Sequence, residues 1–269
     1  MDNDNNLFHT HDEKISIFIV KVEVFVLLFL MEASSVDEKI TAIILAAGKG
    51  SRMQSEMPKQ YLPLFGKPIL FYSLQAFEQS IVDEIILVVG KQEQEYCKKE
   101  IVEKYGFQKV VHIVEGGAER YHSVYQGLLV AKKAKYVLIH DGARPLITME
   151  MIHMAIKEVR QKGACVVGMP VKDTIQLVTT EKVIESTPIR NRTWIAQTPQ
   201  CFEHSIALSA YEKAIEQQDG SITDDAMVVM RYGKQEVSMI EGSYENIKVT
   251  TPEDILLAEL FLNQRKNKK

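Results

Sequence analysis

The segment richest in possible chemistry comes at the end of the first predicted strand, at residues 45–70 (LAAGKGSRMQSEMPKQYLPLFGKPIL). Small residues there are followed by two cations, Arg52 and Lys59. Small side chains let a backbone approach a ligand closely, and the exposed N–H groups of such a turn bind phosphate oxygens, whose charge the cations offset. We therefore predict a phosphate-binding loop for a nucleotide. Its nucleotide-binding residues are predicted to be Ala46, Ala47, Gly48 and Gly50.

This loop matches neither of two common phosphate-binding motifs. A Walker A sequence, GxxxxGK[ST], is absent, and Met53 stands where a dinucleotide fingerprint needs its third glycine. A tight turn with solvated charges is the alternative interpretation of two glycines alone. The presence of Arg52 and Lys59 so close to the glycines favours phosphate binding.

A second candidate is the sequence HDGARP at residues 140–145, which directly follows the apolar run YVLI. This position places Asp141 at the carboxyl end of a strand, where open α/β sheets bind ligands. A carboxylate there can hold Mg²⁺ against triphosphate oxygens, because magnesium is usually bound by one or two carboxylates plus phosphates. A loop aspartate that caps the next turn is an equal alternative on spacing alone. Arg144 can reach a phosphate or pair with Asp141, and both interpretations stay open.

Alternation of apolar runs with helix-period stretches defines the elements that must position these residues. From residue 40 the pattern is typical of βα units, so we predict an α/β, Rossmann-like fold with a mostly parallel sheet flanked by helices. Strands are expected at 40–47, 83–89, 109–114, 136–140, 164–171, 236–240 and 245–249. Helices are expected at 67–79, 91–105, 119–132, 149–162 and 203–217, with two more opened by Thr223 and Thr251. Asp224 and Asp225 are expected to be acids at a helix N-terminus.

The alternation breaks at residues 172–197, which lack a helical apolar stripe and predict short strands around a polar turn. Such an arm buries little surface of its own and needs a partner surface, most simply a second subunit. We therefore expect a homodimer through a protruding β-arm. Residues 40–264 are taken as one domain that carries this arm, and residues 265–269 as a solvated tail.

The N-terminal residues do not fit this fold. Residues 1–14 are polar and acidic, and residues 15–31 are apolar with Lys21 and Glu23 inside the run. A signal peptide needs a basic start, and a membrane span needs about 20 apolar residues, so both patterns are poor matches. We expect residues 1–39 to be an extension outside the fold, with the functional chain starting near Met31.

Composition narrows the class of protein. Of 269 residues, 46% are hydrophobic and 25% charged, and 32 Lys plus Arg against 36 Asp plus Glu leave a formal charge of −4 without a basic block. This argues against nucleic-acid binding, and no membrane interaction is expected. The cysteines Cys97, Cys165 and Cys201 show no CxxC or zinc-ligand spacing, which indicates a reduced, cytoplasmic protein.

Several further motifs follow the loop in order. They are GGAERYHSV (116–124), HDGARPLI (140–147), VKDT (171–174), TPQCF (198–202), ITDDA (222–226) and ENIKVTTPEDILLAE (245–259). Over residues 40–264 the chain resembles nucleotidyltransferases of the nucleoside-diphospho-sugar transferase type, and in detail the 2-C-methyl-D-erythritol 4-phosphate cytidylyltransferase family of the non-mevalonate isoprenoid pathway. The resemblance implies a magnesium-dependent homodimeric enzyme that converts CTP and 2-C-methyl-D-erythritol 4-phosphate to 4-diphosphocytidyl-2-C-methyl-D-erythritol and pyrophosphate.

The resemblance also implies roles for individual residues in phosphate chemistry. Arg52 and Lys59 would stabilise the charge of the transition state, and Lys248 would bring the two phosphates together. Thr174 and Arg190 would contact the methylerythritol phosphate bound to the other subunit. Without the resemblance, Lys248 reads as a strand-edge lysine in solvent and Arg190 as a solvated arm residue.

For the nucleotide and the metal, the resemblance places Gly117 and Ser123 near cytosine and ribose, although a helix start after a Gly-Gly turn explains both equally well. Ala118 stands where some members have Asp. Asp141 would bind the metal together with Glu245, which stands where many members have Asp.

Two rival functions remain. Ribitol-5-phosphate cytidylyltransferases share the fold, the loop and the phosphate chemistry, but Ala143 in HDGARP favours the methylerythritol enzymes, because the rival more often has VRP there. A nucleotide-binding protein without turnover is the other alternative. The presence of Arg52, Lys59, Asp141 and Lys248 together argues against it.

Overall fold

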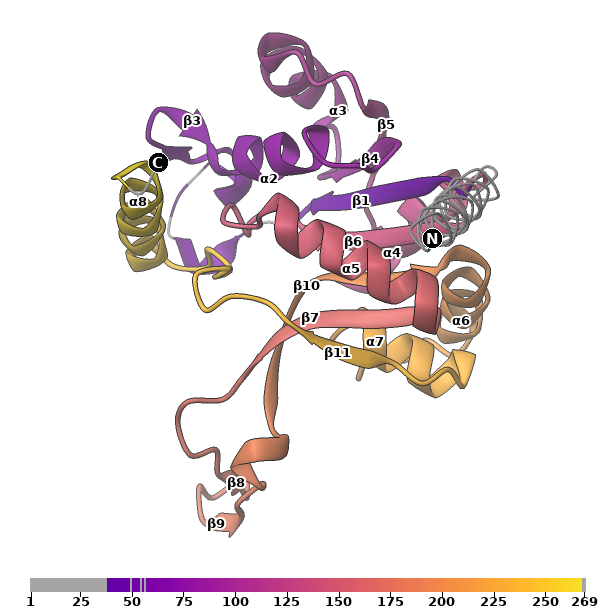
Figure 1. Ribbon diagram of the computed structural model, residues 1–269, viewed down its shortest axis with the longest axis vertical. Coiled ribbons are helices and arrows are strands. Elements are labelled where there is room, and N and C mark those ends of the chain that lie inside the picture. Colours follow the sequence, from indigo (N-terminus) through magenta and orange to yellow (C-terminus); the bar gives the residue numbers. More distant parts are fainter. Residues whose placement is uncertain (1–37, 49, 54, 56, 268–269) are drawn as a thin grey trace, which may run out of the picture. The chain divides into compact units, whose positions relative to one another are not determined.

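A seven-stranded sheet runs through the computed structural model, which describes residues 38–48, 50–53, 55 and 57–267 (Figure 1). The strand order is β11-β7-β10-β6-β1-β4-β5, and all neighbours are parallel except β10, which is antiparallel to both β6 and β7. The predicted α/β class with a mostly parallel sheet is confirmed. The strands are β1 (Ile40–Ala46), β4 (Glu84–Val89), β5 (Val110–Glu115), β6 (Tyr136–Asp141), β7 (Ala164–Pro170), β10 (Trp194–Glu203) and β11 (Ser238–Glu241).

Helices cover both faces of the sheet because the central strands are apolar on both sides. On one face Ile44 of β1 belongs to a core with α2 (Ile69–Glu78) and α5 (Met149–Lys162). On the other face the neighbouring Ile43 packs in a core with α4 (Arg120–Val130) and α6 (His204–Glu216). Successive strand residues thus serve opposite layers, and both Ile43 and Ile44 are fully buried.

Five of the predicted helices are continuous, and two differ from expectation. The helix predicted at 91–105 is a short α3 (Gln94–Tyr96) that continues as a π-helix, Cys97–Glu103. The helix opened by Thr223 is α7 (Asp225–Val228), followed by a π-helix, Val229–Gly233. The final helix α8 (Pro252–Asn267) includes the first three residues of the predicted solvated tail at 265–269, of which Lys266 and Asn267 are exposed.

One strand prediction fails, and three strands were missed. Strand β10 was not expected, and its first residues, from Trp194, belong to the sheet rather than to the arm. Residues 245–249, predicted as a strand, form no strand and lie in the connection between β11 and α8. Two short strands, β2 (Pro63–Leu64) and β3 (Lys67–Pro68), were also missed and form a small ribbon of their own.

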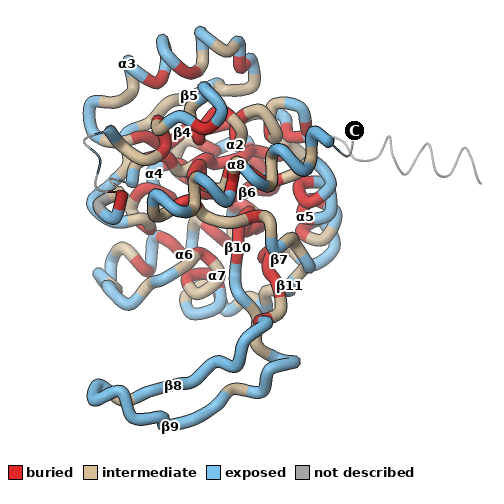
Figure 2. Tube along the Cα trace, turned by 90° about the vertical axis from the view of Figure 1, so that its left-hand side faces the viewer, coloured by how far each residue is buried: buried red, intermediate tan, exposed pale blue. Residues whose placement is uncertain are grey.

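The predicted arm projects from the sheet between β7 and β10 (Figure 2). It contains β8 (Leu177–Val178), the antiparallel β9 (Ile184–Ser186) and a 3-10 turn, Arg190–Arg192. Nearly all its residues are exposed. The apolar ones include Leu177, Val178, Val183, Ile184 and Ile189, each at least half exposed.

The expected extension at residues 1–39 lies almost wholly outside the described residues. Residues Lys39–Lys269 form one compact unit. Among the helices that the structure describes, none has the length and apolar character needed to cross a bilayer.

The close packing of α4 on β1 generates a test of the fold. A Cβ atom at Gly127 would lie 2.5 Å from Cγ2 of Ile43. Gly127→Ala should therefore lower the free energy of unfolding by about 1–3 kcal/mol, although alanine normally favours a helix. Urea denaturation measures this change. The matched control is Gln126→Ala, at an exposed position of the same helix, which should leave stability unchanged or slightly raised; equal effects of the two variants would contradict the packing.

Candidate active site

A cavity of about 730 Å³ opens at the carboxyl ends of the parallel strands. Ala46 ends β1, Asp141 ends β6, and Gly90 and Gly116 directly follow β4 and β5. This is the edge at which open α/β sheets bind ligands. Nine of the predicted site residues line the cavity: Ala46, Ala47, Gly48, Gly50, Lys59, Gly117, Ser123, Asp141 and Lys248.

The glycine-containing loop after β1 forms the first wall. Gly50 has a positive φ of 65°, and a Cβ atom there would lie 3.0 Å from Cβ and Cγ of Lys59. Glycine is therefore favoured at this position for two reasons: the backbone conformation is left-handed, and the aliphatic part of the Lys59 side chain leaves little space for a Cβ atom. Gln60, next in sequence, is buried and donates from Nε2 to the Ala46 carbonyl at 2.6 Å. This bond ties the turn that carries Lys59 to the end of β1.

The second wall is the turn that opens α4. The Gly117 N–H donates to Oγ of Ser123 at 3.1 Å, and a Cβ atom at Gly116 would lie 2.6 Å from both Ala47 and Ser123 side-chain atoms. Helix α4 then begins with a capping box between Glu119 and His122. The turn is thus in direct contact with the first wall. Ser123 belongs to the start of the helix, as one interpretation of the sequence expected, and it also lines the cavity, as the other expected.

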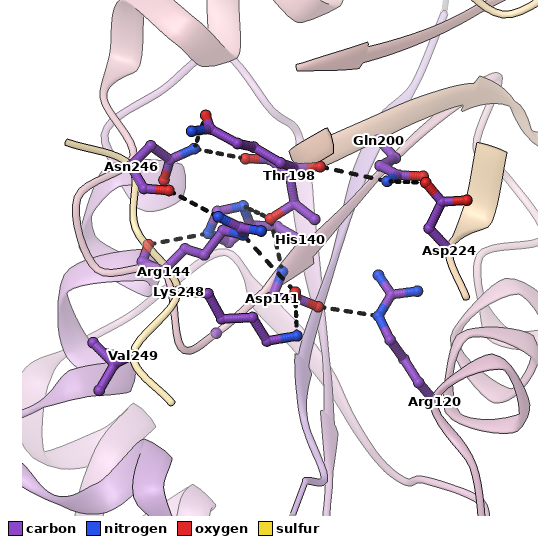
Figure 3. A network of polar contacts seen from close by, with 12 residues as sticks. Arg120, His140, Asp141, Arg144, Thr198, Gln200, Asp224, Asn246, Lys248 and Val249 are labelled. Carbon is purple, nitrogen blue, oxygen red and sulfur yellow. Dashed lines mark hydrogen bonds and ion pairs between the residues drawn. The ribbon is translucent and has the colours of Figure 1, made fainter. Parts of the chain in front are cut away.

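Asp141 lies at the centre of a cluster of cations (Figure 3). Nζ of Lys248 is 2.8 Å from Oδ2, and Nε of Arg120 is 3.2 Å from Oδ1. Burial by itself raises the pKa of this carboxyl, but the charges of Arg120, Lys248 and Arg144 outweigh burial and hold the pKa well below its usual range. Asp141 is therefore a permanent carboxylate with a side chain only 10% exposed.

Arg144 resolves the alternative left open by the sequence. Its Nε lies 3.9 Å from Oδ2 of Asp141, and its NH1 group donates to the Asn246 carbonyl at 2.8 Å. The side chain is 12% exposed, and Arg144 does not line the cavity. The structure thus favours pairing with Asp141 over contact with a phosphate.

Lys59 combines burial with positive neighbours. Its Nζ donates to the Val249 carbonyl at 3.0 Å, beside Lys248. Burial and then the charge of Lys248 lower the pKa of Lys59 to about 8, although Asp141 acts in the opposite direction. The group has few compensating partners, so an incoming anion would stabilise its charged form.

Lys248 lies on the connection between β11 and α8. This connection is not paired as a strand, and other hydrogen bonds hold it in place. Asn246 is fully buried, and its Nδ2 lies 3.0 Å from the Thr198 carbonyl and 3.2 Å from Oε1 of Gln197. The Val249 N–H donates to the Ala143 carbonyl at 2.8 Å. Further along, the Asp254 carboxylate accepts from the backbone N–H groups of Thr250 and Thr251.

Four predicted site residues lie outside the cavity lining. Arg52 is exposed, but its charge lowers the pKa of Lys59. Thr174 and Arg190 are hydrogen-bonded to each other on the arm. Glu245 pairs with Arg265 of α8, with 2.8 Å between Oε2 and Nε, so the geometry gives no support to a metal-binding role for Glu245.

Arg120 is a site residue that the sequence analysis missed. It lines the cavity, contacts Asp141 and binds Asp225 with both terminal nitrogens at 2.7 and 2.8 Å. Its position at the start of a predicted helix, inside GGAERYHSV, was the only available signal. Asp224 caps α7 by accepting from the Met227 N–H at 2.9 Å, as expected, whereas Asp225 is fully buried against Arg120.

A glycine-containing loop after the first strand, together with lysines around a carboxylate at the same sheet edge, is typical of α/β nucleotide-binding transferases. Comparison with protein families matches residues 40–264 to 2-C-methyl-D-erythritol 4-phosphate cytidylyltransferase. The chain therefore belongs to the 2-C-methyl-D-erythritol 4-phosphate cytidylyltransferase family.

Individual relatives agree with this assignment. A protein of that name from Lachnoclostridium phytofermentans is 51% identical over 230 residues, covering 86% of this chain and 99% of the relative. One from Alkaliphilus oremlandii is 47% identical over 230 residues, covering 85% and 97%. The crystal structure of 4-diphosphocytidyl-2C-methyl-D-erythritol synthase from Anaerococcus prevotii superposes with a TM-score of 0.74 at 32% identity, covering 84% of this chain and 97% of that one.

The lowered pKa of Lys59 generates a pH-dependence prediction. Only the ammonium form attracts phosphates, so affinity for CTP should fall as pH rises through about 8. Between pH 7 and pH 9 the loss should be about tenfold, since the charged fraction falls by that factor. Calorimetric titration measures it. Lys59→Arg keeps its charge throughout and should lose the step near pH 8; the same pH dependence in both proteins would contradict the assignment to Lys59.

Proposed function

We propose that this chain transfers the cytidylyl group of CTP to 2-C-methyl-D-erythritol 4-phosphate and releases pyrophosphate, in the non-mevalonate isoprenoid pathway. The observation that carries the proposal is the cavity itself, where Lys59, Lys248 and Asp141 meet the glycine-containing loop in a chain of this family. All three charged groups come from different segments of the chain. Their convergence at one sheet edge is what a triphosphate-binding transferase needs.

The reaction is a displacement at the α-phosphorus of CTP. A phosphate oxygen of the methylerythritol phosphate forms the new P–O bond, the bond to the β-phosphate bridge breaks, and pyrophosphate leaves with the electron pair. The attacking phosphate is already an anion, so no general base is needed. Catalysis then consists of aligning two anions and stabilising the charge that gathers on the α-phosphoryl oxygens.

The chain's cations divide this work. We assign Lys59, with Arg52 on the same loop, to the charge of the transition state, because Lys59 is the half-buried cation with a lowered pKa. Lys248, which neighbours Lys59 in the cavity, is assigned to bringing the two phosphates together. The backbone of Ala46, Ala47, Gly48 and Gly50 is assigned to the triphosphate, and Gly117 and Ser123 to the cytidine side.

Asp141 is our candidate ligand for Mg²⁺ or another divalent cation. No group of three or more His, Cys, Asp or Glu side chains is arranged for a metal among the described residues, so protein ligands alone would not form the site. One buried carboxylate facing the triphosphate cavity fits a magnesium ion that takes its other ligands from phosphates and water. When bound, the ion neutralises triphosphate charge and makes pyrophosphate a better leaving group.

The arm is proposed to complete the site of a second subunit in a homodimer. Its exposed apolar residues have no partner surface among the described residues of this chain, and Thr174 and Arg190 lie together on it. We assign this pair to the methylerythritol phosphate bound by the other subunit. Cys97, Cys165 and Cys201 are buried free thiols, which supports a reducing, cytoplasmic location.

The activity is tested by pyrophosphate release from the full chain with CTP and Mg²⁺. We expect turnover with 2-C-methyl-D-erythritol 4-phosphate at a rate well above that with ribitol 5-phosphate. Preference for ribitol 5-phosphate would keep the mechanism but change the substrate. CTP binding without release from either compound would instead indicate a non-catalytic nucleotide-binding protein.

The shared site generates a complementation prediction. Lys59→Ala and Arg190→Ala should each be nearly inactive as pure proteins, the second through a raised KM for the polyol phosphate. Subunit exchange in an equal mixture should restore about a quarter of wild-type activity, since half the dimers are mixed and each has one intact site. Activity of dissociated and reassociated mixtures measures this. No recovery would mean that Lys59 and Arg190 serve the same subunit's site, whereas an active Arg190→Ala protein would mean that the arm is outside it.

A further inference from the structure

Arg120 is held between two carboxylates at the wall of the cavity. Its two terminal nitrogens bind both oxygens of Asp225, at 2.7 and 2.8 Å, and its Nε donates to Oδ1 of Asp141 at 3.2 Å. The first contact is the paired geometry in which a guanidinium binds a carboxylate most strongly. Lysine cannot reproduce it, because an ammonium is a single point of charge.

Asp225 provides a rigid anchor for this arginine. Its side chain is fully buried at the start of α7, and Tyr211 of α6 donates its hydroxyl to Oδ1 of the same carboxylate. Burial and then the charge of Asp225 raise the pKa of Tyr211 well above its ordinary value, so the hydroxyl remains a donor. Arg120 is thus fixed to the helical layer rather than to the loops of the cavity.

The two oxygens of Asp141 consequently have unlike partners. Oδ1 faces the anchored guanidinium of Arg120, whereas Oδ2 faces Nζ of Lys248 at 2.8 Å. The ammonium group of Lys248 ends a long side chain with several rotatable bonds. This side chain is 35% exposed, and Lys248 lines the cavity. An incoming triphosphate competes for the lysine but leaves the Arg120–Asp225 pair in place.

We propose that Arg120 is a positioning residue, itself anchored by Asp225 and Tyr211. Arg120 holds Asp141 through Oδ1, so that Oδ2 can exchange the ammonium of Lys248 for the divalent cation that accompanies CTP. This inference rests on the proposed function only in taking Asp141 as the metal ligand. Arg120 acts through Asp141 and does not bind the nucleotide. For its terminal nitrogens to reach a phosphate, Arg120 would have to leave Asp225 as a buried, unpaired charge, which is strongly unfavourable.

The test uses CTP binding by the full chain, measured by calorimetry without any polyol phosphate. In Arg120→Lys the apparent dissociation constant for Mg²⁺ in the presence of CTP should rise by about 10- to 100-fold, the usual effect of removing a partner of a metal ligand. Affinity for CTP in EDTA should change by less than about threefold, because the contacts between the protein and the nucleotide itself are not removed by this substitution. Tyr211→Phe removes one hydroxyl from the anchor and should weaken Mg²⁺ binding in the same direction to a smaller extent.

Arg231→Lys is the matched control, because Arg231 pairs with Asp219 at a surface site outside the cavity lining. It should change neither affinity. A loss of CTP affinity in EDTA as large as the loss for Mg²⁺ would overturn the proposal, because Arg120 would then contact the nucleotide. Unchanged Mg²⁺ binding in both Arg120→Lys and Tyr211→Phe would also overturn it, and mark the cluster as merely structural.

If Arg120→Lys fails to fold, Tyr211→Phe decides alone: a rise of at least about threefold in the Mg²⁺ dissociation constant supports the proposal and no rise overturns it. The assay contains no acceptor substrate and no turnover. A wild-type chain that binds CTP with Mg²⁺ but transfers to neither polyol phosphate would therefore refute the proposed activity and leave the result for Arg120 standing. Absence of Mg²⁺-dependent CTP binding in the wild type would overturn the positioning role as well.

Discussion

The carboxylate of Asp141 joins three segments of the chain that lie far apart in the sequence. Arg120 comes from the start of α4, Arg144 from the loop after β6, and Lys248 from the connection between β11 and α8. Removing one partner from such a buried cluster leaves uncompensated charge, which costs far more than a surface ion pair contributes. The cluster thus fixes the relative positions of the cavity walls, and the walls in turn determine where a triphosphate can bind.

Cations exceed carboxylates around this point. Lys59, Lys248, Arg120 and Arg144 surround Asp141 and Asp225, and the chain around them is acidic overall. A local positive excess in a half-enclosed cavity attracts polyanions, because fields are screened less there than on an open surface. The pKa of Lys59 is lowered first by burial and then by the neighbouring charge of Lys248, so the crowding of cations contributes to it as the second cause.

The sequence predicted those parts of the structure that depend on local pattern. The buried strands and the glycine-containing loop follow from apolar runs and small residues, and both are present. Strand β10 was missed because Pro199 argues against a central strand; the structure accommodates it at an irregularity where the pairing of β10 with β7 shifts between Ala196 and Gln200. Residues 245–249 alternate like a strand, but backbone groups there bond instead to distant partners such as Lys59 and Arg144. Arg120 was also missed because its role depends on a contact between distant residues: Asp225, which binds it, lies 105 positions further along the chain.

Two of the cavity lysines, Lys59 and Lys248, are linked through one stretch of backbone. Lys59 binds the carbonyl of Val249, and Lys248, the residue before it, binds Asp141. An anion that drew either ammonium away would remove a bond of the same connection. Asn246 and Asp254 hold that connection independently on both sides, so such a change would be confined to the few residues between them. On the proposed function, the two lysines would therefore respond together to a triphosphate, while Asp141 stays held by Arg120 of the helical layer.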